Sequence, residues 1–85
     1  MRIEFEVGEK EKHTVIAEYS KWTGKMEISV DAKNIISKNV ACEFKQPYFK
    51  FDVGSKEKHK VEVLLKGLVL TSFEVLIDGK IKNTG

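Results

Sequence analysis

Apolar and polar residues alternate along most of this chain with a period of two. Such alternation is typical of half-buried β-strands, in which one face packs on a core and the other meets water. The window 31–38 has some helical character, but the strand-like segments beside it argue against a helix there. The apolar members of the alternating segments are Met1, Ile3, Phe5 and Val7; Val15, Ala17 and Tyr19; Met26, Ile28 and Val30; Phe49, Phe51 and Val53; Val61, Val63 and Leu65; and Phe73, Val75 and Ile77.

The chain contains an internal repeat. Residues 5–15, FEVGEKEKHTV, recur as residues 51–61, FDVGSKEKHKV, with eight of the eleven positions identical. A second match, one residue out of phase, aligns residues 28–33 with residues 75–80. Two matches in the same order indicate a tandem duplication, so we expect repeats of approximately 5–35 and 51–81 within one domain spanning 1–85.

Glycine and proline predict where the strands turn. Asp78-Gly79 is a strong signal for a two-residue type I′ hairpin, because that turn needs positive φ values. The equivalent Asp31-Ala32 lacks the glycine, which predicts a longer or different turn with Asn34 in the left-handed region. Gly8 and Gly54 predict a bend or bulge at a strand end, and Pro47 predicts an edge or a break between strands.

These signals together predict the fold class. About eight short strands joined by hairpins, with no helix of useful length, are typical of a small antiparallel β-sandwich or barrel. We expect an all-β sandwich with an approximate internal two-fold axis, because the duplicated units are equivalent.

The placed strands resemble the Fas apoptotic inhibitory molecule (FAIM) family over roughly residues 13–81. This chain departs from the pattern, since Ala32 replaces a glycine, the segment 40–44 lacks a tryptophan, and one domain is present where family members carry two. The resemblance implies a β-sandwich and a non-enzymatic role in protein interaction. The motifs that carry it are His13-Thr14-Val15, Thr23-Gly24-Lys25, Val30-Asp31-Ala32-Lys33, Phe51-x-Val53-Gly54, Lys60-Val61-Glu62-Val63 and Val75-Leu76-Ile77-Asp78-Gly79-Lys80.

The composition limits the cellular compartment and the classes of partner that we expect. Cys42 is the one cysteine, so an internal disulfide is impossible. The first residues alternate in polarity instead of forming the apolar run of a signal peptide, and nothing approaches a membrane span of roughly 18 apolar residues. The net charge is only +2, and lysines and glutamates alternate in the 8–12 loop. We therefore expect a cytoplasmic protein without a basic nucleic-acid-binding stripe.

Two histidines and two lysine-rich loops are the first candidate sites. His13 and His59 hold equivalent repeat positions and can converge about the two-fold axis, but two histidines fall short of the ligands that zinc needs. Lys10 with Lys12, and the equivalent lysines of the 54–58 loop, can cradle an anion, although the glycine-rich phosphate motif is missing. Solvated strand ends and ordinary charged loops are the simpler interpretation of both, so we expect no metal and no cofactor.

Nucleic-acid binding and catalysis find less support. The available rings are Trp22, Tyr48, Phe49 and Phe51, but both phenylalanines fit the core alternation. Trp22 and Tyr48 are left as stacking platforms, so a single-stranded nucleic-acid-binding small β-barrel is the alternative function. We expect no enzyme, because the aspartates fall at turns and strand ends and Cys42 has no neighbouring base.

The second repeat is more apolar than the first. Leucines occupy both faces of its predicted strands, whereas the position equivalent to Leu76 in the first repeat is Ser29. A contiguous apolar patch on a small protein usually marks an interface, although burial of this strand pair on both sides is the alternative. We expect a protein partner, with a homodimer as the simplest case, and we expect Leu76→Glu to disrupt association without unfolding the protein. The candidate partner-binding residues are Leu64, Leu68, Leu70, Leu76 and Trp22.

Overall fold

The computed structural model describes residues 1–40, 47–66 and 72–82. Every secondary-structure element in these ranges is a β-strand, which confirms the predicted all-β class. None of the described residues forms a helix that is long and apolar enough to cross a membrane. The strands are β1 (Arg2–Val7), β2 (His13–Tyr19), β3 (Lys25–Val30), β4 (Lys33–Asn39), β5 (Tyr48–Val53), β6 (His59–Lys66), β7 (Ser72–Ile77) and β8 (Lys80–Lys82).

The strands form two antiparallel sheets with the same simple topology. The N-terminal sheet has the order β1-β2-β3-β4, and the C-terminal sheet has the order β5-β6-β7-β8. Each sheet is therefore built from one continuous stretch of chain that contains one repeat. Phe5 pairs with Val15 in the first sheet, and Phe51 pairs with Val61 in the second, so the repeat also has the same register in both.

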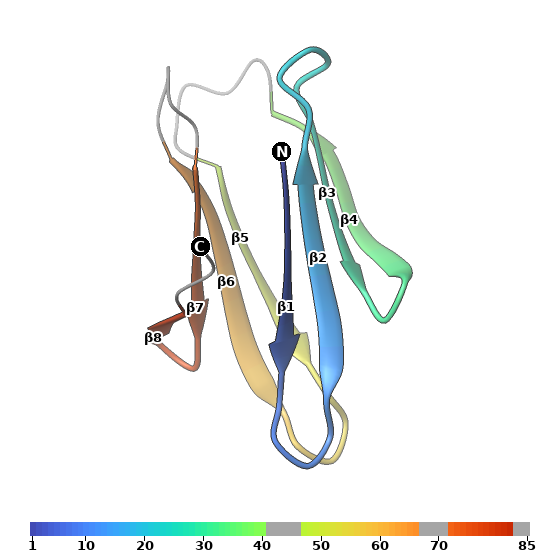
Figure 1. The fold of residues 1–85 in the computed structure, drawn as a ribbon, viewed down its shortest axis with the longest axis vertical. Coiled ribbons are helices and arrows are strands. Elements are labelled where there is room, and N and C mark those ends of the chain that lie inside the picture. The colour runs from blue at the N-terminus through green and yellow to red at the C-terminus, as the bar shows by residue number, and fades with distance from the viewer. Residues whose placement is uncertain (41–46, 67–71, 83–85) are drawn as a thin grey trace.

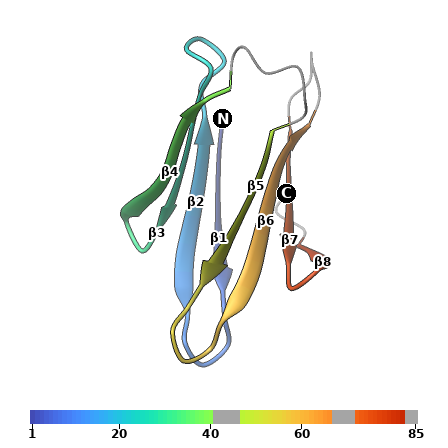
Figure 2. The ribbon, with the colours of Figure 1, turned by 180° about the vertical axis from the view of Figure 1, so that it is seen from behind.

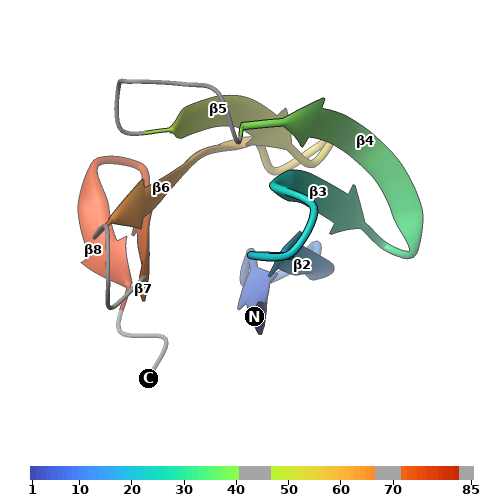
Figure 3. The same ribbon diagram turned by 90° about the horizontal axis from the view of Figure 1, so that it is seen from above.

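The two sheets face each other and bury one core between them, as a β-sandwich does. The β1–β2 and β5–β6 loops lie at one end, while β4 and β8 lie on opposite outer sides (Figures 1 and 2). The view from above shows both sheets curving around the shared interior (Figure 3). The buried residues come from both sheets: Phe5, Val7, Val15, Ala17, Met26 and Ile28 from the first, with Val40 directly after β4, and Phe49, Val53, Val61, Val63, Leu65 and Val75 from the second.

The turn after β3 differs from the prediction. Asp31 and Ala32 both have positive φ, at 50° and 67°, and Lys33 already begins β4. This is a two-residue turn like that of Asp78 and Gly79, whose φ values are 53° and 80°. The expectation of a longer turn through Asn34 was wrong, because the register of the hairpin forces Ala32 into the conformation that glycine prefers.

The glycines at the ends of β1 and β5 take positive φ, as their predicted bends require. Gly8 has φ of 105° and Gly54 of 103°. A Cβ atom on Gly8 would lie 2.0 Å from the carbonyl oxygen of Glu11, so a side chain cannot fit there. Pro47 directly precedes the edge strand β5, consistent with its predicted place at an edge, and its carbonyl accepts a hydrogen bond from the Leu65 amide at 3.1 Å.

Candidate interaction surfaces

The outer face of the C-terminal sheet carries a contiguous group of apolar side chains. Val61, Val63 and Leu65 are buried on the inner face, so the alternation of the strand turns Leu64 outward. Tyr48 pairs with Leu64 across β5 and β6, and Leu76 pairs with Ile81 across β7 and β8. Leu64 and Leu76 lie diagonally on the neighbouring strands β6 and β7, with Glu74 opposite Leu64 and Glu62 opposite Leu76, at a spacing that long side chains can bridge. We call Tyr48, Leu64, Leu76 and Ile81 the outer apolar patch.

The side chains of the outer apolar patch differ in their exposure to solvent. Tyr48 is 50% exposed and Ile81 is 72% exposed, at the two edges of the sheet. Leu64 and Leu76 are half-buried on the central strands. The structure thus places Leu64 and Leu76 on the face away from the core, as the sequence pattern predicted. Leu68 and Leu70, the other predicted members, lie outside the described residues.

The repeat provides a direct comparison for the patch, because the N-terminal sheet has the same register. Arg2 occupies the place of Tyr48 and pairs with Glu18, which occupies the place of Leu64. Ser29 occupies the place of Leu76. The Arg2 guanidinium lies 3.9 Å from the Glu18 carboxylate, so polar groups cover this part of the sheet. At these three outer positions the first copy is charged or polar and the second is apolar, whereas at the adjoining position the first copy has Ile16 and the second has Glu62.

Charged residues border the outer apolar patch in balanced numbers. Glu74 forms an ion pair with Lys66, and Glu62 lies opposite Lys50 across β5 and β6. Partial burial and the nearby carboxylate of Glu62 raise the pKa of the Tyr48 hydroxyl further above neutral pH, so this residue adds no charge to the patch. The border therefore adds no net charge that would repel an identical surface.

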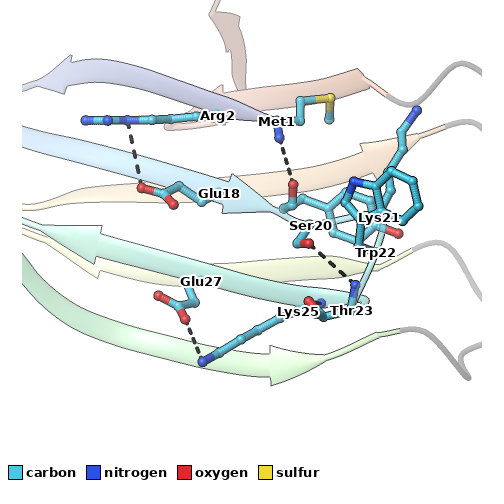
Figure 4. Close-up of a pocket in the computed structure, with 10 residues that line it drawn as sticks. Met1, Arg2, Glu18, Ser20, Lys21, Trp22, Thr23, Lys25 and Glu27 are labelled. Carbon is cyan, nitrogen blue, oxygen red and sulfur yellow. Dashed lines mark hydrogen bonds and ion pairs between the residues drawn. The ribbon is translucent and has the colours of Figure 1, made fainter.

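Trp22 lies at the tip of the β2–β3 hairpin and is 98% exposed. It borders an open hollow of about 450 Å³ with the N-terminal residues and the start of β3 (Figure 4). Four of the charged side chains around the hollow form pairs within the sheet, since Lys25 lies 2.9 Å from Glu27 and Arg2 lies 3.9 Å from Glu18. The predicted exposure of Trp22 is confirmed, and this indole is separated from the outer apolar patch because it belongs to the other sheet.

Two glutamates at the opposite end of the molecule link the loops of the two repeats. The carboxylate of Glu11 accepts hydrogen bonds from the backbone amides of Ser55 at 2.7 Å and Lys56 at 2.9 Å. Reciprocally, the carboxylate of Glu57 accepts them from the amides of Glu9 at 2.7 Å and Lys10 at 2.9 Å. We call this reciprocal pair of contacts the loop clasp. Charge-assisted bonds of this kind are among the stronger ones in proteins.

Each histidine holds the clasp glutamate of its own repeat. His13 Nε2 lies 2.6 Å from Glu11 Oε2, and His13 Nδ1 lies 2.5 Å from Asp31 Oδ2. Asp31, followed by Glu11, raises the pKa of His13, because both carboxylates favour the charged imidazolium. Hydrogen bonds from His13 and from the amides of Lys56 and Ser55 lower the pKa of Glu11 to about 2.

The second repeat reproduces this arrangement. His59 lies 2.6 Å from Glu57 and 2.5 Å from Asp78, and the pKa of Glu57 is likewise lowered to about 2. Both nitrogens of each ring are engaged, which leaves neither ring a free nitrogen for a metal or for proton transfer to a substrate. The described residues contain no group of three or more metal-binding side chains. Cys42 lies outside the described residues.

The histidines and the lysine-rich loops thus form neither a metal site nor ordinary solvated strand ends and loops. His13 and His59 do begin strands, but their side chains are only about one-fifth exposed, so they are not the solvated ends that we expected. The 8–12 and 54–58 loops do bind an anionic group through their backbone amides, and that group is the glutamate of the other repeat. The sequence repeats Glu11 as Glu57, but the two loops differ only at Glu9 and Ser55, so nothing singles out these glutamates from the other repeated loop residues.

Comparisons of this chain with protein-family models, with curated proteins and with solved structures find no match. The resemblance to the FAIM family therefore stays a prediction from the motifs in the sequence. What the molecule can do follows from its own surfaces.

Proposed function

We propose that this chain is a non-catalytic protein-interaction module and that its outer apolar patch binds a second copy of the chain. The observation that carries the proposal is the contrast between equivalent positions of the two sheets. Tyr48, Leu64 and Leu76 are apolar where the first sheet has charged or polar residues. Exposed apolar side chains reduce solubility, so their presence on one of two equivalent faces favours a role in binding.

A second copy is the occupant that best suits the charges. The ion pair of Lys66 with Glu74 leaves the border of the patch balanced, so two identical patches meet without strong repulsion. The outer face of the N-terminal sheet is less suitable, because Glu4, Glu18 and Glu27 add negative charge to it. Two patches that meet around a two-fold axis form a closed, isologous dimer.

The test exchanges patch residues for their equivalents in the first repeat. The triple variant Tyr48→Arg/Leu64→Glu/Leu76→Ser keeps the net charge and uses residues that the same fold already carries at these places. We expect light scattering to give wild-type protein a molar mass that approaches twice 9.7 kDa as concentration rises, with little dependence on salt. The measurement uses protein that has not been denatured, and the variant is then expected to stay at 9.7 kDa with an unchanged circular dichroism spectrum.

The reverse exchange is the matched control. Arg2→Tyr/Glu18→Leu/Ser29→Leu gives the first sheet the apolar residues of the second. We expect assemblies larger than a dimer, because each copy then has two apolar outer faces that can bind another copy. Wild-type protein that stays monomeric at all concentrations would contradict self-association. A triple variant that unfolds would show instead that these residues support the core.

The wild-type protein can also be used to test the alternative function, single-stranded nucleic-acid binding. Trp22 is the one tryptophan and is exposed, so stacking of a base on it would change its fluorescence directly. Such binding would weaken steeply with salt. Because Trp22 and Tyr48 belong to different sheets, they do not form one stacking platform, and we favour protein interaction.

A further inference from the structure

Strand pairing divides the described chain into two self-contained units. β1–β4 pair only among themselves, and so do β5–β8. A unit alone would expose the inner face of its sheet, so its stability depends on a second sheet that covers that face. In the monomer, this covering sheet is the other unit of the same chain.

The surface between the units is built from equivalent residues. Val7 and Val53 are 1% and 2% exposed, and Val15 and Val61 are both fully buried. These residues are identical between the repeats, as are Phe5 and Phe51. The interface thus resembles that of a symmetric dimer of two units, and a unit supplied by another copy offers the same apolar surface.

The loop clasp adds directional contacts to this surface. In the other unit, the Glu11 carboxylate accepts hydrogen bonds from the Ser55 amide, the Ser55 hydroxyl and the Lys56 amide, at 2.7 to 3.3 Å. Glu57 binds the equivalent loop of the first unit. These contacts fix how one unit sits on the other, and they require the partner loop without requiring that both loops belong to one chain.

We propose that the inner face and loop clasp of each unit also accept the complementary unit of a second copy, which gives a dimer with exchanged units. In this dimer the N-terminal sheet of each copy packs on the C-terminal sheet of the other, and both loop clasps form between chains. Each sandwich keeps its core and its clasp, because it still contains one N-terminal sheet and one C-terminal sheet.

Deleting residues 41–46 tests the exchange. The ends of the connection are anchored in opposite sheets, because the Val40 amide donates to Gly24 at 2.8 Å and the Pro47 carbonyl accepts from Leu65 at 3.1 Å. Direct linkage would place the Cα atoms of Val40 and Pro47 about 3.8 Å apart, whereas facing sheets pack about 10 Å apart. We expect the deletion variant to fold as a dimer with the wild-type circular dichroism spectrum, and to lose that spectrum on dilution because folding then requires two chains. A folded monomer would overturn the proposal.

Cross-linking tests the exchange with the connection intact. Lys10 and Lys56 border one hollow of about 610 Å³ between the two loops, so a flexible bismaleimide can join the Lys10→Cys/Lys56→Cys variant in a Cys42→Ser background. After refolding from denaturant, we expect links between chains, seen as dimers on a denaturing gel, in a fraction that rises with protein concentration. Links within single chains at every concentration would overturn the proposal, even if the deletion variant fails to fold.

The patch variant separates this inference from the proposed function. Tyr48→Arg/Leu64→Glu/Leu76→Ser removes the outer apolar patch but changes nothing between the units. We expect the exchanged dimer to form in this background as in wild type, since its contacts lie on the inner faces. Loss of the cross-linked dimer in this variant would show that the outer apolar patch had produced it, and would overturn the exchange.

Discussion

Ala32 occupies a backbone conformation that alanine rarely adopts. Its φ of 67° lies in the left-handed region, which costs a residue with a Cβ atom about 1–2 kcal/mol. Ala32→Gly removes this strain, while the greater freedom of glycine in the unfolded chain returns about 0.4–1 kcal/mol. We expect a net gain of about 0.5–1 kcal/mol in the free energy of unfolding, measured by urea denaturation.

The equivalent turn of the second unit provides the opposite substitution. Gly79 has φ of 80°, and a Cβ atom placed on it would meet nothing within 4 Å. Gly79→Ala therefore isolates the cost of backbone strain, and we expect it to lower the free energy of unfolding by about the amount that Ala32→Gly adds. Equal effects of the same sign in the two turns would contradict this account.

The same turns show how far single residues predict the structure. Val61, Val63 and Leu65 were assigned to one face correctly, because a period of two in a strand fixes which side chains share a side. Ala32 gave no turn signal, since its conformation is imposed by the register of β3 and β4. Tyr48 and Ile81 were missed as patch members, because only strand pairing places them beside Leu64 and Leu76.

At the scale of elements, the loops that end β1 and β5 interact across the molecule. The carboxylate of Glu11 protects the amides of Ser55 and Lys56, which lie far away in sequence. No local pattern predicts such a contact, because it depends on how two sheets meet. The repeated loops are visible in the sequence, but the contacts by which each loop binds the other depend on the packing of the two sheets.

Removing one carboxylate should therefore loosen the opposite loop. We expect Glu11→Ala to speed hydrogen exchange at the Ser55 and Lys56 amides about tenfold, since a charge-assisted hydrogen bond is lost from each. The control is Glu9→Ala, which changes the same loop but leaves the Glu11 carboxylate in place. Faster exchange only within the 8–12 loop of the Glu11→Ala variant would contradict the clasp.

At the scale of the whole molecule, two kinds of contact hold the sheets together. The shared core is apolar and insensitive to pH, and it includes buried residues such as Met26 and Val63 from opposite sheets. The loop clasp consists of charge-assisted hydrogen bonds to the carboxylates of Glu11 and Glu57, and the ion pairs of His13 with Glu11 and Asp31, like their equivalents in the second repeat, support these carboxylates. A pH titration therefore changes one kind of contact and leaves the other intact.

The loop clasp predicts that the stability of the protein falls at both low and high pH. The folded state raises the pKa of His13 and His59 above 6.5, so their contribution is complete below pH 6.5 and is lost as pH rises through the raised values. It lowers the pKa of Glu11 and Glu57 from 4.5 to about 2, so their contribution is complete above pH 4.5 and is lost as pH falls toward 2. We expect melting temperature, followed by circular dichroism, to be highest between about pH 4.5 and 6.5. In His13→Gln/His59→Gln the limb above pH 6.5 should flatten while the acidic limb persists, and an unchanged alkaline limb would show that the histidines do not cause it.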